Sequence, residues 1–483
     1  MASTNISFEK IPASIRKPGK YFEYNTRNAV RTLATNGQSM LVIAQRLEDS
    51  TAPLEPVRVY DDATAGQLFG YGSQAHLMAR AAIKAYPYVD LSVLPVPPHS
   101  AGLAATGTLT LTGEATGSGV LTLTVGTAQI SVAAAYKDAA ADTLAELSKA
   151  LEAEQDLPVT AAVTTAEATE EAPNPEPTLT ITAKNKGTLG NAVSLAVACT
   201  VPGYTAAVVK MGNGQQDPEL EDALAAVFGA DYTLYCLPWA GENQLRALRD
   251  HLEAISGPLE QRRGTTWLAT PGTLATAATL AGGVNSERIS LACLPGSASL
   301  PEEVAAAYCA VAASEEDPAR PLNTLELTNL AAPPDTARLS RTEQEVALKS
   351  GVTPLAVGPG GVVQIVRAIS TYTKNPAGVA DVSMLDMTTI RTVDYVAKAV
   401  RERVELRFPR EKLSTRTPPK VRSEVLDVLR ILEELEILEN VEANAEGVIV
   451  ERDLQDPNRL NCRIPADVVN GLHVFAGVIE LLL

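Results

Sequence analysis

Cysteine, histidine and aromatic residues are scarce in this sequence of 483 residues. It has five cysteines and four histidines, and Phe, Trp and Tyr together make up 4% of it. No two cysteines form a CxxC pair and no histidines form an HExxH motif, so nothing indicates a disulfide scaffold or a metal site. We expect the five thiols to be small buried core residues, in cores built mainly from Ala, Val and Leu.

Long apolar runs are absent as well. No uninterrupted run approaches the ~18–20 residues that cross a bilayer, and the start MASTNISFEKIP has no cationic region followed by an apolar one. We therefore expect neither a membrane span nor a secretory signal. The 57 acidic residues exceed the 40 basic ones, which gives a net charge of −17. That charge argues against nucleic acid or an anionic membrane as the main partner.

Motifs of catalysis and cofactor binding are also missing. The glycine cluster Gly358–Gly361 is followed by no GK[ST] sequence and is typical of a turn. No GxSxG elbow is present, and His251 beside Asp250 reads as a surface pair in the middle of a helix. We expect no catalytic, cofactor-binding or metal-binding residue and no cofactor.

The order of patterns predicts a multidomain α/β protein. Residues 1–36 are polar and lack a helical period, as expected for an extended arm. Residues 37–97 and 208–335 alternate buried strands with helices of 10–15 residues, which predicts a central doubly covered α/β domain. Residues 98–207 alternate Thr with apolar residues and predict an inserted, antiparallel β-rich domain, which we expect to lie on the outer surface. We expect Pro333–Pro334 to close the central domain and residues 340–483 to form an α+β C-terminal domain.

The last twelve residues, LHVFAGVIELLL (Leu472–Leu483), are apolar on both alternating faces except at His473 and Glu480. An apolar strand is an aggregation hazard unless its edges and faces are covered. Two explanations fit: the strand packs inside its own domain, or it is donated to a neighbouring subunit by β-strand addition. The N-terminal arm has the same need for an outside partner.

Basic residues gather in one segment of this acidic chain. Between Arg391 and Arg422, ten basic residues face four acidic ones, a local charge of 10 − 4 = +6. Pairs spaced i,i+4, such as Asp394/Lys398, would make part of this an ordinary solvated helix face. The alternative is a surface for self-association or for an acidic partner. The helix in this segment carries a predicted apolar stripe of Ile390, Val393, Ala397, Val400 and Val404. The next predicted helix, Arg422–Leu438, should bury Val425, Val428, Leu429, Leu432 and Leu435.

Several separate motifs resemble one known family. They are ISFEKIPASIRKPGKYFEYN, ALAAVFGADYTLYCLPW, DPARPLNTLEL, VRAISTYTKNPAGVADVSMLDM, RFPREKL, VERDLQDPNRL and IPADVVNGLHVFAGVIELLL. Together they resemble tail sheath proteins of Mu-like contractile bacteriophages, over residues 1–97 and 208–483. The resemblance is weakest across the β-rich insertion.

The resemblance implies a structural protein. Such sheaths stack as six-subunit rings around a tail tube, and on a baseplate signal they contract and drive the tube through the host envelope. It implies as partners further copies of the chain, the tail tube protein, and baseplate and tail-terminator proteins, with assembly in the host bacterial cytoplasm and a final place in the virion tail. It also implies a central domain of subtilisin-like shape, without protease activity.

The resemblance further assigns two sets of residues. Terminal strands of the family join neighbouring subunits, which here implicates Tyr21, Phe22, Glu23, Tyr24, Val474, Phe475, Val478, Ile479 and Leu481. The family's tube-facing surface lies in its C-terminal domain, for which the candidates are Arg391, Lys398, Arg401, Arg403 and Arg407. A phage-tail-like bacteriocin or another contractile injection system is the alternative, and a hydrolase on the α/β domain is a weaker one.

Overall fold

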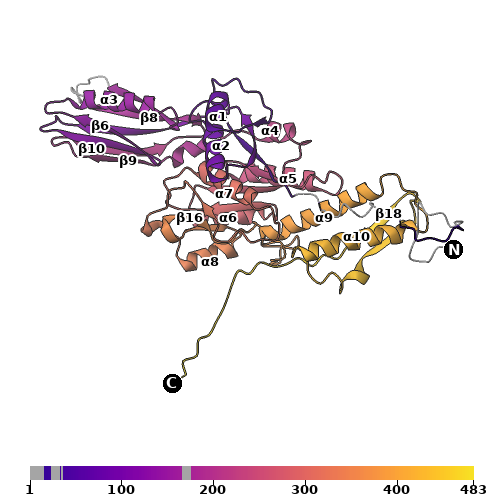
Figure 1. Cartoon of the computed structure of the whole chain (residues 1–483). Helices are drawn as coiled ribbons and strands as arrows, with labels where there is room; N and C mark the ends of the chain where they lie inside the picture. Colours follow the sequence, from indigo (N-terminus) through magenta and orange to yellow (C-terminus); the bar gives the residue numbers. More distant parts are fainter. Residues whose placement is uncertain (1–15, 23–32, 34–35, 166–175, 483) are drawn as a thin grey trace.

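The computed structural model describes residues 16–22, 33, 36–165 and 176–482 (Figure 1). Three parts follow one another across the molecule. A β-rich region lies at one end, an α/β part lies in the middle, and a helical C-terminal part lies at the other end, with the last residues leading away from the body.

The middle part is built on a nine-stranded sheet, in the order β14-β16-β15-β13-β12-β11-β1-β3-β2. From β3 to β15 all neighbouring strands are parallel, and the outer strands pair antiparallel. The strands are β1 (Ser39–Gln45), β2 (Val57–Arg58), β3 (Asp90–Val96), β11 (Leu234–Cys236), β12 (Thr265–Thr270), β13 (Ile289–Cys293), β14 (Glu326–Leu327), β15 (Thr353–Val357) and β16 (Val363–Ile365).

Helices cover both faces of this sheet, because its strands are apolar on both sides. On β1, Met40 and Val42 belong to one hydrophobic core, and Leu41 and Ile43 to the other. The first core includes α1 (Asp62–Phe69), α2 (Gln74–Ala85) and α7 (Pro301–Ser314). The second includes α4 (Glu221–Ala226), α5 (Glu242–Ser256), α6 (Leu274–Val284) and α8 (Arg341–Lys349). This arrangement confirms the mixed α/β fold that the sequence predicts.

The β-rich region holds two antiparallel sheets, β10-β4-β8-β7 and β6-β5-β9, with one helix packed on them. Its elements are β4 (Ala104–Thr112), β5 (Gly119–Val125), β6 (Ala128–Ala134), α3 (Ala140–Ala153), β7 (Val159–Thr165), β8 (Pro177–Lys186), β9 (Leu195–Cys199) and β10 (Thr205–Gly212). Leucines such as Leu109 and Leu111 point inward between half-buried threonines, as the period-2 pattern predicts. Leu103 and Gln215 pair at the base of the region by two backbone hydrogen bonds of 3.0 and 3.1 Å.

Two expected boundaries differ from the structure. The central sheet runs on to Ile365, so the boundary expected between residues 335 and 340 falls inside it. The prolines Pro333–Pro334 suggested a domain end, but the chain returns through α8 to add β15 and β16. The β-rich region also extends past residue 207, to the end of β10.

The C-terminal part consists of α9 (Met387–Arg407), α10 (Thr417–Glu434) and the hairpin of β17 (Ile449–Arg452) and β18 (Leu460–Arg463). On α10, Val425, Val428, Leu429 and Leu432 are buried as predicted, whereas Leu435 is exposed just beyond the helix end. The remaining short helical turns in the chain are η1 (Thr188–Ala192), η2 (Asp335–Ala337), η3 (Pro359–Gly361) and η4 (Ala445–Gly447).

The apolar stripe predicted for α9 needs correction. Only Ile390 of the five stripe residues is fully buried, and the others are half-buried. The helix buries Tyr395, Val396 and Ala399 instead, because it packs on α10 along one side while its first half also lies against the central part.

Three of the five cysteines lie in the core as expected: Cys236, Cys293 and Cys309 are buried. Cys199 is half-buried and Cys462 is exposed. The expectation was therefore wrong for Cys462, which lies on β18 of a two-stranded hairpin where one face is open.

Candidate assembly interface

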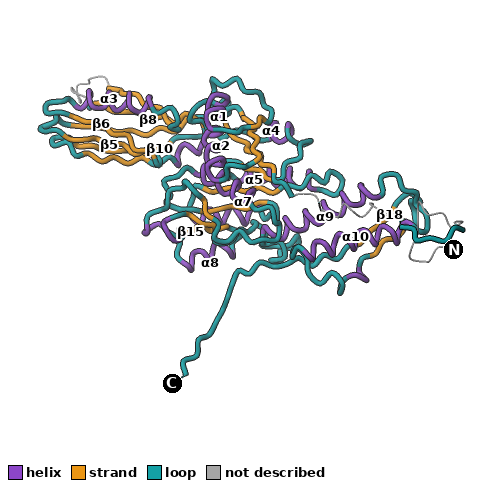
Figure 2. The backbone as a smooth tube through the Cα atoms, in the orientation of Figure 1, coloured by secondary structure: helices purple, strands orange, loops and turns teal. Residues whose placement is uncertain are grey.

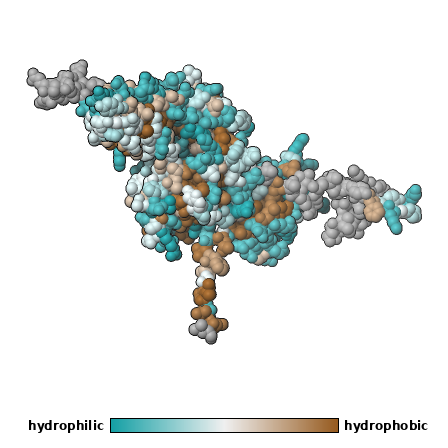
Figure 3. All heavy atoms as spheres, turned by 60° about the vertical axis from the view of Figure 1, so that its left-hand side comes forward, coloured by the Kyte–Doolittle hydropathy of each residue, from teal (hydrophilic) through white to brown (hydrophobic). Residues whose placement is uncertain are grey.

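The C-terminal segment, defined here as Ile464–Leu482, contains neither helix nor strand and is drawn as loop throughout (Figure 2). From Leu472 on, its apolar side chains are exposed: Phe475 is 90% exposed and Ile479 is 99% exposed. Val474, Val478 and Leu481 are exposed in the same way. Figure 3 shows this apolar stretch pointing away from the body. The stretch from Val474 on therefore does not pack inside its own domain, and packing there was one of the two explanations of the sequence.

The first half of the segment is anchored. Asp467 accepts a backbone hydrogen bond from Glu439 at 2.9 Å, and Val469 donates one to Ile437 at 3.3 Å. Val468 forms an isolated bridge with Leu438. These contacts hold residues 467–469 along the connection that follows α10, so the exposed part begins only after them.

His473 is the last anchored side chain before the exposed part. Its Nδ1 atom lies 2.8 Å from the side-chain nitrogen of Asn323, and its Nε2 atom lies 3.5 Å from Asp386 Oδ1. Asp386 also forms a two-pronged ion pair with Arg367, at 2.8 and 2.7 Å. Burial lowers the pKa of His473, and the Arg367 charge lowers it further. His473 is thus held between Asn323 of the central part and Asp386 at the start of α9, whereas its neighbour Leu472 is exposed.

Part of the predicted N-terminal strand can be located. Tyr21 and Phe22 lie in a segment without regular structure, and Phe22 is 84% exposed. The Tyr21 hydroxyl donates a hydrogen bond to the backbone oxygen of Lys17 at 3.1 Å. Glu23 and Tyr24 lie outside the described residues.

An apolar groove of about 300 Å³ lies beside the β17–β18 hairpin. It runs between α9, α10 and β18, so three elements of the C-terminal part form its walls. Its apolar lining includes Val400, Val404, Phe408, Leu413, Val421, Leu460 and Ile464. Sequence reasoning missed this groove, because its residues come from four separate stretches of sequence that only the fold brings together.

Two of the tube-facing candidates point toward α10. Arg403 is only 5% exposed and pairs with Glu424 at 3.4 Å and Asp427 at 3.1 Å. Arg407 lies 3.5 Å from Glu424. Arg403 is therefore not available on the surface of the chain. Its charge is tolerated in the interior because it is paired with these two carboxylates.

The other three candidates, Arg391, Lys398 and Arg401, lie on the face of α9 that is turned toward the central part. Arg391 is only 7% exposed and is likewise removed from the surface. Lys398 and Arg401 are half-buried. The tube-facing role thus stays a prediction for Lys398, Arg401 and Arg407.

One His–Asp pair in the central part invites comparison with a catalytic centre. His76 Nε2 lies 2.8 Å from Asp62 Oδ1, and His76 Nδ1 accepts a hydrogen bond from the Gly72 backbone at 3.0 Å. Both ring nitrogens are therefore engaged. The adjacent Ser73 hydroxyl accepts from the backbone nitrogen of His76 at 3.0 Å and caps the start of α2. These residues stabilise a helix start and present no activated nucleophile.

His251 does not form the expected surface pair. It is buried against the rings of Phe228 and Tyr235, with centroid distances of 6.1 and 5.8 Å. Burial lowers the pKa of His251 to about 4. Asp250 pairs instead with Arg249 at 2.8 Å.

Within the described ranges, no group of His, Cys, Asp and Glu is placed to hold a metal ion. In the same part of the chain, every helix is too short or too polar to cross a membrane.

Comparison with known proteins places this geometry in context. Residues 198–371 match the phage tail sheath protein central domain, and residues 379–481 match the phage tail sheath C-terminal domain. The chain is 32% identical to the Mu-like prophage FluMu tail sheath protein of Haemophilus influenzae, over 99% of this chain and 100% of that protein.

Solved structures show the same fold at lower identity. The sheath tail protein of Desulfitobacterium hafniense matches with a TM-score of 0.51 and 13% identity, over 94% of this chain and 97% of that one. The helical sheath of the anti-feeding prophage in its contracted state matches with a TM-score of 0.50 and 12% identity, over 97% of this chain and 99% of that one. The full-length match to a Mu-like sheath protein shows that this chain belongs to the phage tail sheath protein family, as a structural, non-enzymatic subunit of a contractile tail.

Proposed function

We propose that the chain polymerises as stacked hexameric rings around a tail tube, and that contraction of this sheath drives the tube through the host cell envelope. The exposed apolar C-terminal segment carries the proposal. Burying a Val, Leu, Ile or Phe side chain stabilises by roughly 1.5–3 kcal/mol. For Val474, Phe475, Val478, Ile479 and Leu481 together this gives roughly 8–15 kcal/mol before the costs of association. A neighbouring copy that covers them would gain this energy.

We further propose that the β17–β18 hairpin of a neighbouring copy receives the segment. An isolated two-stranded sheet is marginal in water and leaves strand edges unpaired. An added strand would complete its backbone hydrogen bonds. The apolar groove beside β18, with Phe408, Leu460 and Ile464 among its lining, supplies a surface for the apolar side chains of that strand.

The exchanged N-terminal strand, Tyr21 to Tyr24, belongs to the same proposal. The exposed ring of Phe22 supports it, since a large apolar side chain in water gains from an outside partner. Strands that link neighbours through main-chain bonds can keep those links while the subunits turn, and repacking of the remaining interfaces can then supply the work of contraction.

The position of the β-rich region supports its placement on the outside of the sheath. It lies at the end of the molecule opposite to the α9–α10 pair (Figure 1). If the C-terminal part faces the tube, with Lys398, Arg401 and Arg407 as candidates, the β-rich region faces outward. The tail tube, baseplate and tail-terminator partners, and the subtilisin-like shape of the central domain, are part of the same proposal.

The alternative is the sheath of a bacteriocin or of another contractile injection system. The likeness in fold to the helical sheath of the anti-feeding prophage supports this alternative. Neighbouring genes decide between the two, because capsid and genome-packaging genes accompany only a phage.

Electron microscopy of negatively stained chain over a concentration series tests the proposal. We expect tubes or stacked rings from the full chain, and none from a variant that lacks Val474–Leu483. Ile479→Asp should weaken assembly strongly, whereas Leu259→Asp, at a residue that is equally exposed in a turn after α5, should not. Both variants should keep the circular dichroism spectrum of the full chain. Normal tubes from the truncated variant would refute the strand exchange.

A further inference from the structure

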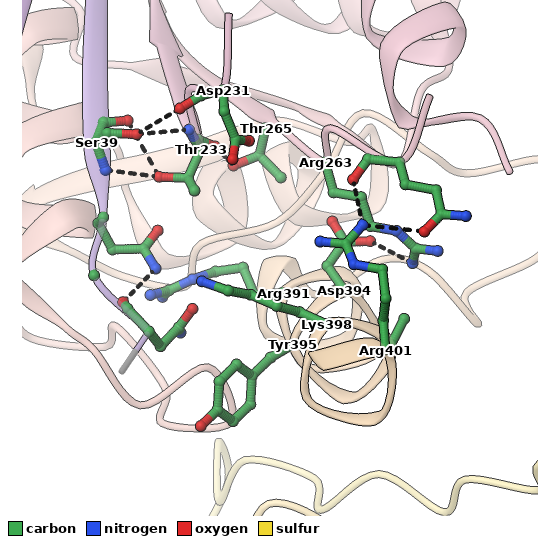
Figure 4. Close-up of a pocket in the computed structure, with 15 residues that line it drawn as sticks. Ser39, Asp231, Thr233, Arg263, Thr265, Arg391, Asp394, Tyr395, Lys398 and Arg401 are labelled. Atoms are coloured by element: carbon green, nitrogen blue, oxygen red, sulfur yellow. Dashed lines mark hydrogen bonds and ion pairs between the residues drawn. The ribbon is translucent and has the colours of Figure 1, made fainter. Parts of the chain in front are cut away.

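A polar cavity of about 170 Å³ lies where the amino ends of three parallel strands meet α9 (Figure 4). Ser39 begins β1, Thr265 begins β12 and Thr233 directly precedes β11, and all three line the cavity. The opposite wall is the face of α9 that carries Arg391, Lys398 and Arg401. The volume is well above the ~10–15 Å³ that one ordered water needs.

The hydroxyl groups at the strand ends already have partners. Thr233 Oγ1 accepts from the backbone nitrogen of Ser39 at 2.9 Å and donates to the backbone oxygen of Ser39 at 3.1 Å. Ser39 Oγ in turn accepts from the backbone nitrogen of Thr233 at 3.2 Å. These reciprocal bonds hold the strand ends that form one wall of the cavity. The cationic side chains lie on the opposite wall, on α9.

The charge of the cavity is positive. Of the described residues that line it, four are cationic and two are carboxylates. One carboxylate, Asp394, is fully occupied: it pairs with Arg263 at 3.1 Å and with Arg288 at 2.8 and 3.1 Å. The other, Asp231, is exposed. Three cations, Arg391, Lys398 and Arg401, therefore outnumber the carboxylates that line the cavity, although the charges of Glu315 and Asp317, outside that lining, also act on Arg391.

Arg391 is the most informative of the three. Arg391 is only 7% exposed, and its Nη2 atom donates a hydrogen bond to the backbone oxygen of Glu315. Its Nη1 atom is buried and has no hydrogen-bond partner among the described residues. Burial lowers the pKa of Arg391 to about 10, which still leaves it charged at neutral pH. A buried charged donor without an acceptor is unfavourable, and an acceptor placed in the cavity would relieve it.

Arg401 donates from its Nη1 atom to Gln261 twice, to the side-chain oxygen at 3.0 Å and to the backbone oxygen at 3.4 Å. Figure 4 shows the side chains of Arg391 and Lys398 extending from α9 on the side of Ser39, and Arg401 reaching from the same helix toward Arg263 and Asp394. All three side chains line the same cavity, and several cationic donors match the several acceptor oxygens of an oxyanion.

We propose that this cavity is an oxyanion site in which Arg391, Lys398 and Arg401 bind a carboxylate or a phosphate group. Two sources share this chemistry: a free phosphate ion, or an acidic side chain of a second copy of the chain. The excess of acidic residues gives every copy many carboxylates to offer. The second source rests on the proposed polymerisation, and the first does not.

Calorimetric titration of the full chain with inorganic phosphate, in chloride buffer of constant ionic strength, tests the free-ion source. Lys398→Gln and Arg401→Gln are the test variants, because both side chains are half-buried and their loss should leave the fold intact. Arg410→Gln is the matched control, since Arg410 belongs to the same basic segment but lies outside the cavity. We expect the test variants to bind phosphate about tenfold more weakly than the full chain and the control.

An assembly assay separates the second source. If the dispersed chain does not bind phosphate but Lys398→Gln and Arg401→Gln raise the concentration needed for tubes about tenfold, while Arg410→Gln does not, the anion is a side chain of a neighbour. Equal phosphate affinity in all four proteins would overturn the site, and so would absent phosphate binding together with unchanged assembly. If phosphate does not bind and the cavity variants form tubes normally, but the variant that lacks Val474–Leu483 forms none, the proposed function is supported and the anion site is refuted.

Discussion

Strand β12 and the C-terminal segment are both short apolar stretches, yet they lie in opposite surroundings. Trp267 on β12 is fully buried, whereas Phe475 is 90% exposed. β12 has a parallel neighbour on each edge and helices over both faces. Beyond His473, the described C-terminal segment has neither. The comparison teaches that an apolar pattern specifies burial but leaves open whether the covering surface belongs to the same chain.

The largest expected effect separates these two stretches in the free chain. Trp267→Ala should lower the free energy of unfolding by about 3–5 kcal/mol, because it opens a cavity in a packed core. Phe475→Ala should change it by less than about 0.5 kcal/mol, because the ring contacts water. Chemical denaturation of the dispersed chain measures both. A loss of several kcal/mol on Phe475→Ala would show that the segment packs on its own chain.

A smaller effect tests the burial of His251 in the central part through the pH dependence of stability. The pKa of His251 is about 4 in the folded chain and about 6.5 when unfolded. Between these values the unfolded chain binds more protons, so stability is complete above pH 6.5 and falls as the pH drops toward 4. The loss should be at most about 3 kcal/mol. His251→Phe should reduce this dependence, which denaturation at a series of pH values measures; an identical dependence in both proteins would contradict the burial.

The smallest effect concerns His473, where the anchored part of the C-terminal segment meets its exposed part. His473→Ala removes the contacts to Asn323 and Asp386, but Asp386 keeps its ion pair with Arg367. We expect stability to change by less than about 1 kcal/mol. Hydrogen exchange in residues 464–473 should become faster, because the last anchor is gone. Leu472→Ala, at an exposed neighbour, serves as the control and should leave exchange unchanged. Equal exchange in both variants would mean that His473 anchors nothing.

Much of the fold could be predicted because local patterns decide it. Alternation of Thr with Leu specified the β-rich strands, and α2 begins after Ser73, which caps it. The missed part depends on contacts between distant residues. The sheet continues past Pro334 because β15 pairs with β13. The residues of β15 themselves do not indicate which strand they pair with.

The basic segment shows the same limit at the candidate site. Its positive charge is visible in the sequence, but the faces of α9 are not equivalent. Arg403 meets carboxylates of α10, and Arg391 enters the polar cavity beside β1. The sequence places both on one helix and gives no sign that either is buried. The last residues of the chain were easier to interpret, because a stretch that is apolar on both alternating faces can be recognised without knowledge of its partner.

The bridge between Leu103 and Gln215 has a consequence for how the chain folds. Met40 on β1 pairs with Leu234 on β11, and the whole β-rich region lies between them in sequence. The bridge brings the two ends of that region together, so once its local hairpins have formed, residues 103–215 no longer add to the flexible length between β1 and β11. Closure entropy rises with the length of the flexible loop, by about 0.6 kcal/mol for each doubling. A region closed at its base in this way can grow or shrink between related chains with little effect on the entropy that the central sheet loses when it forms.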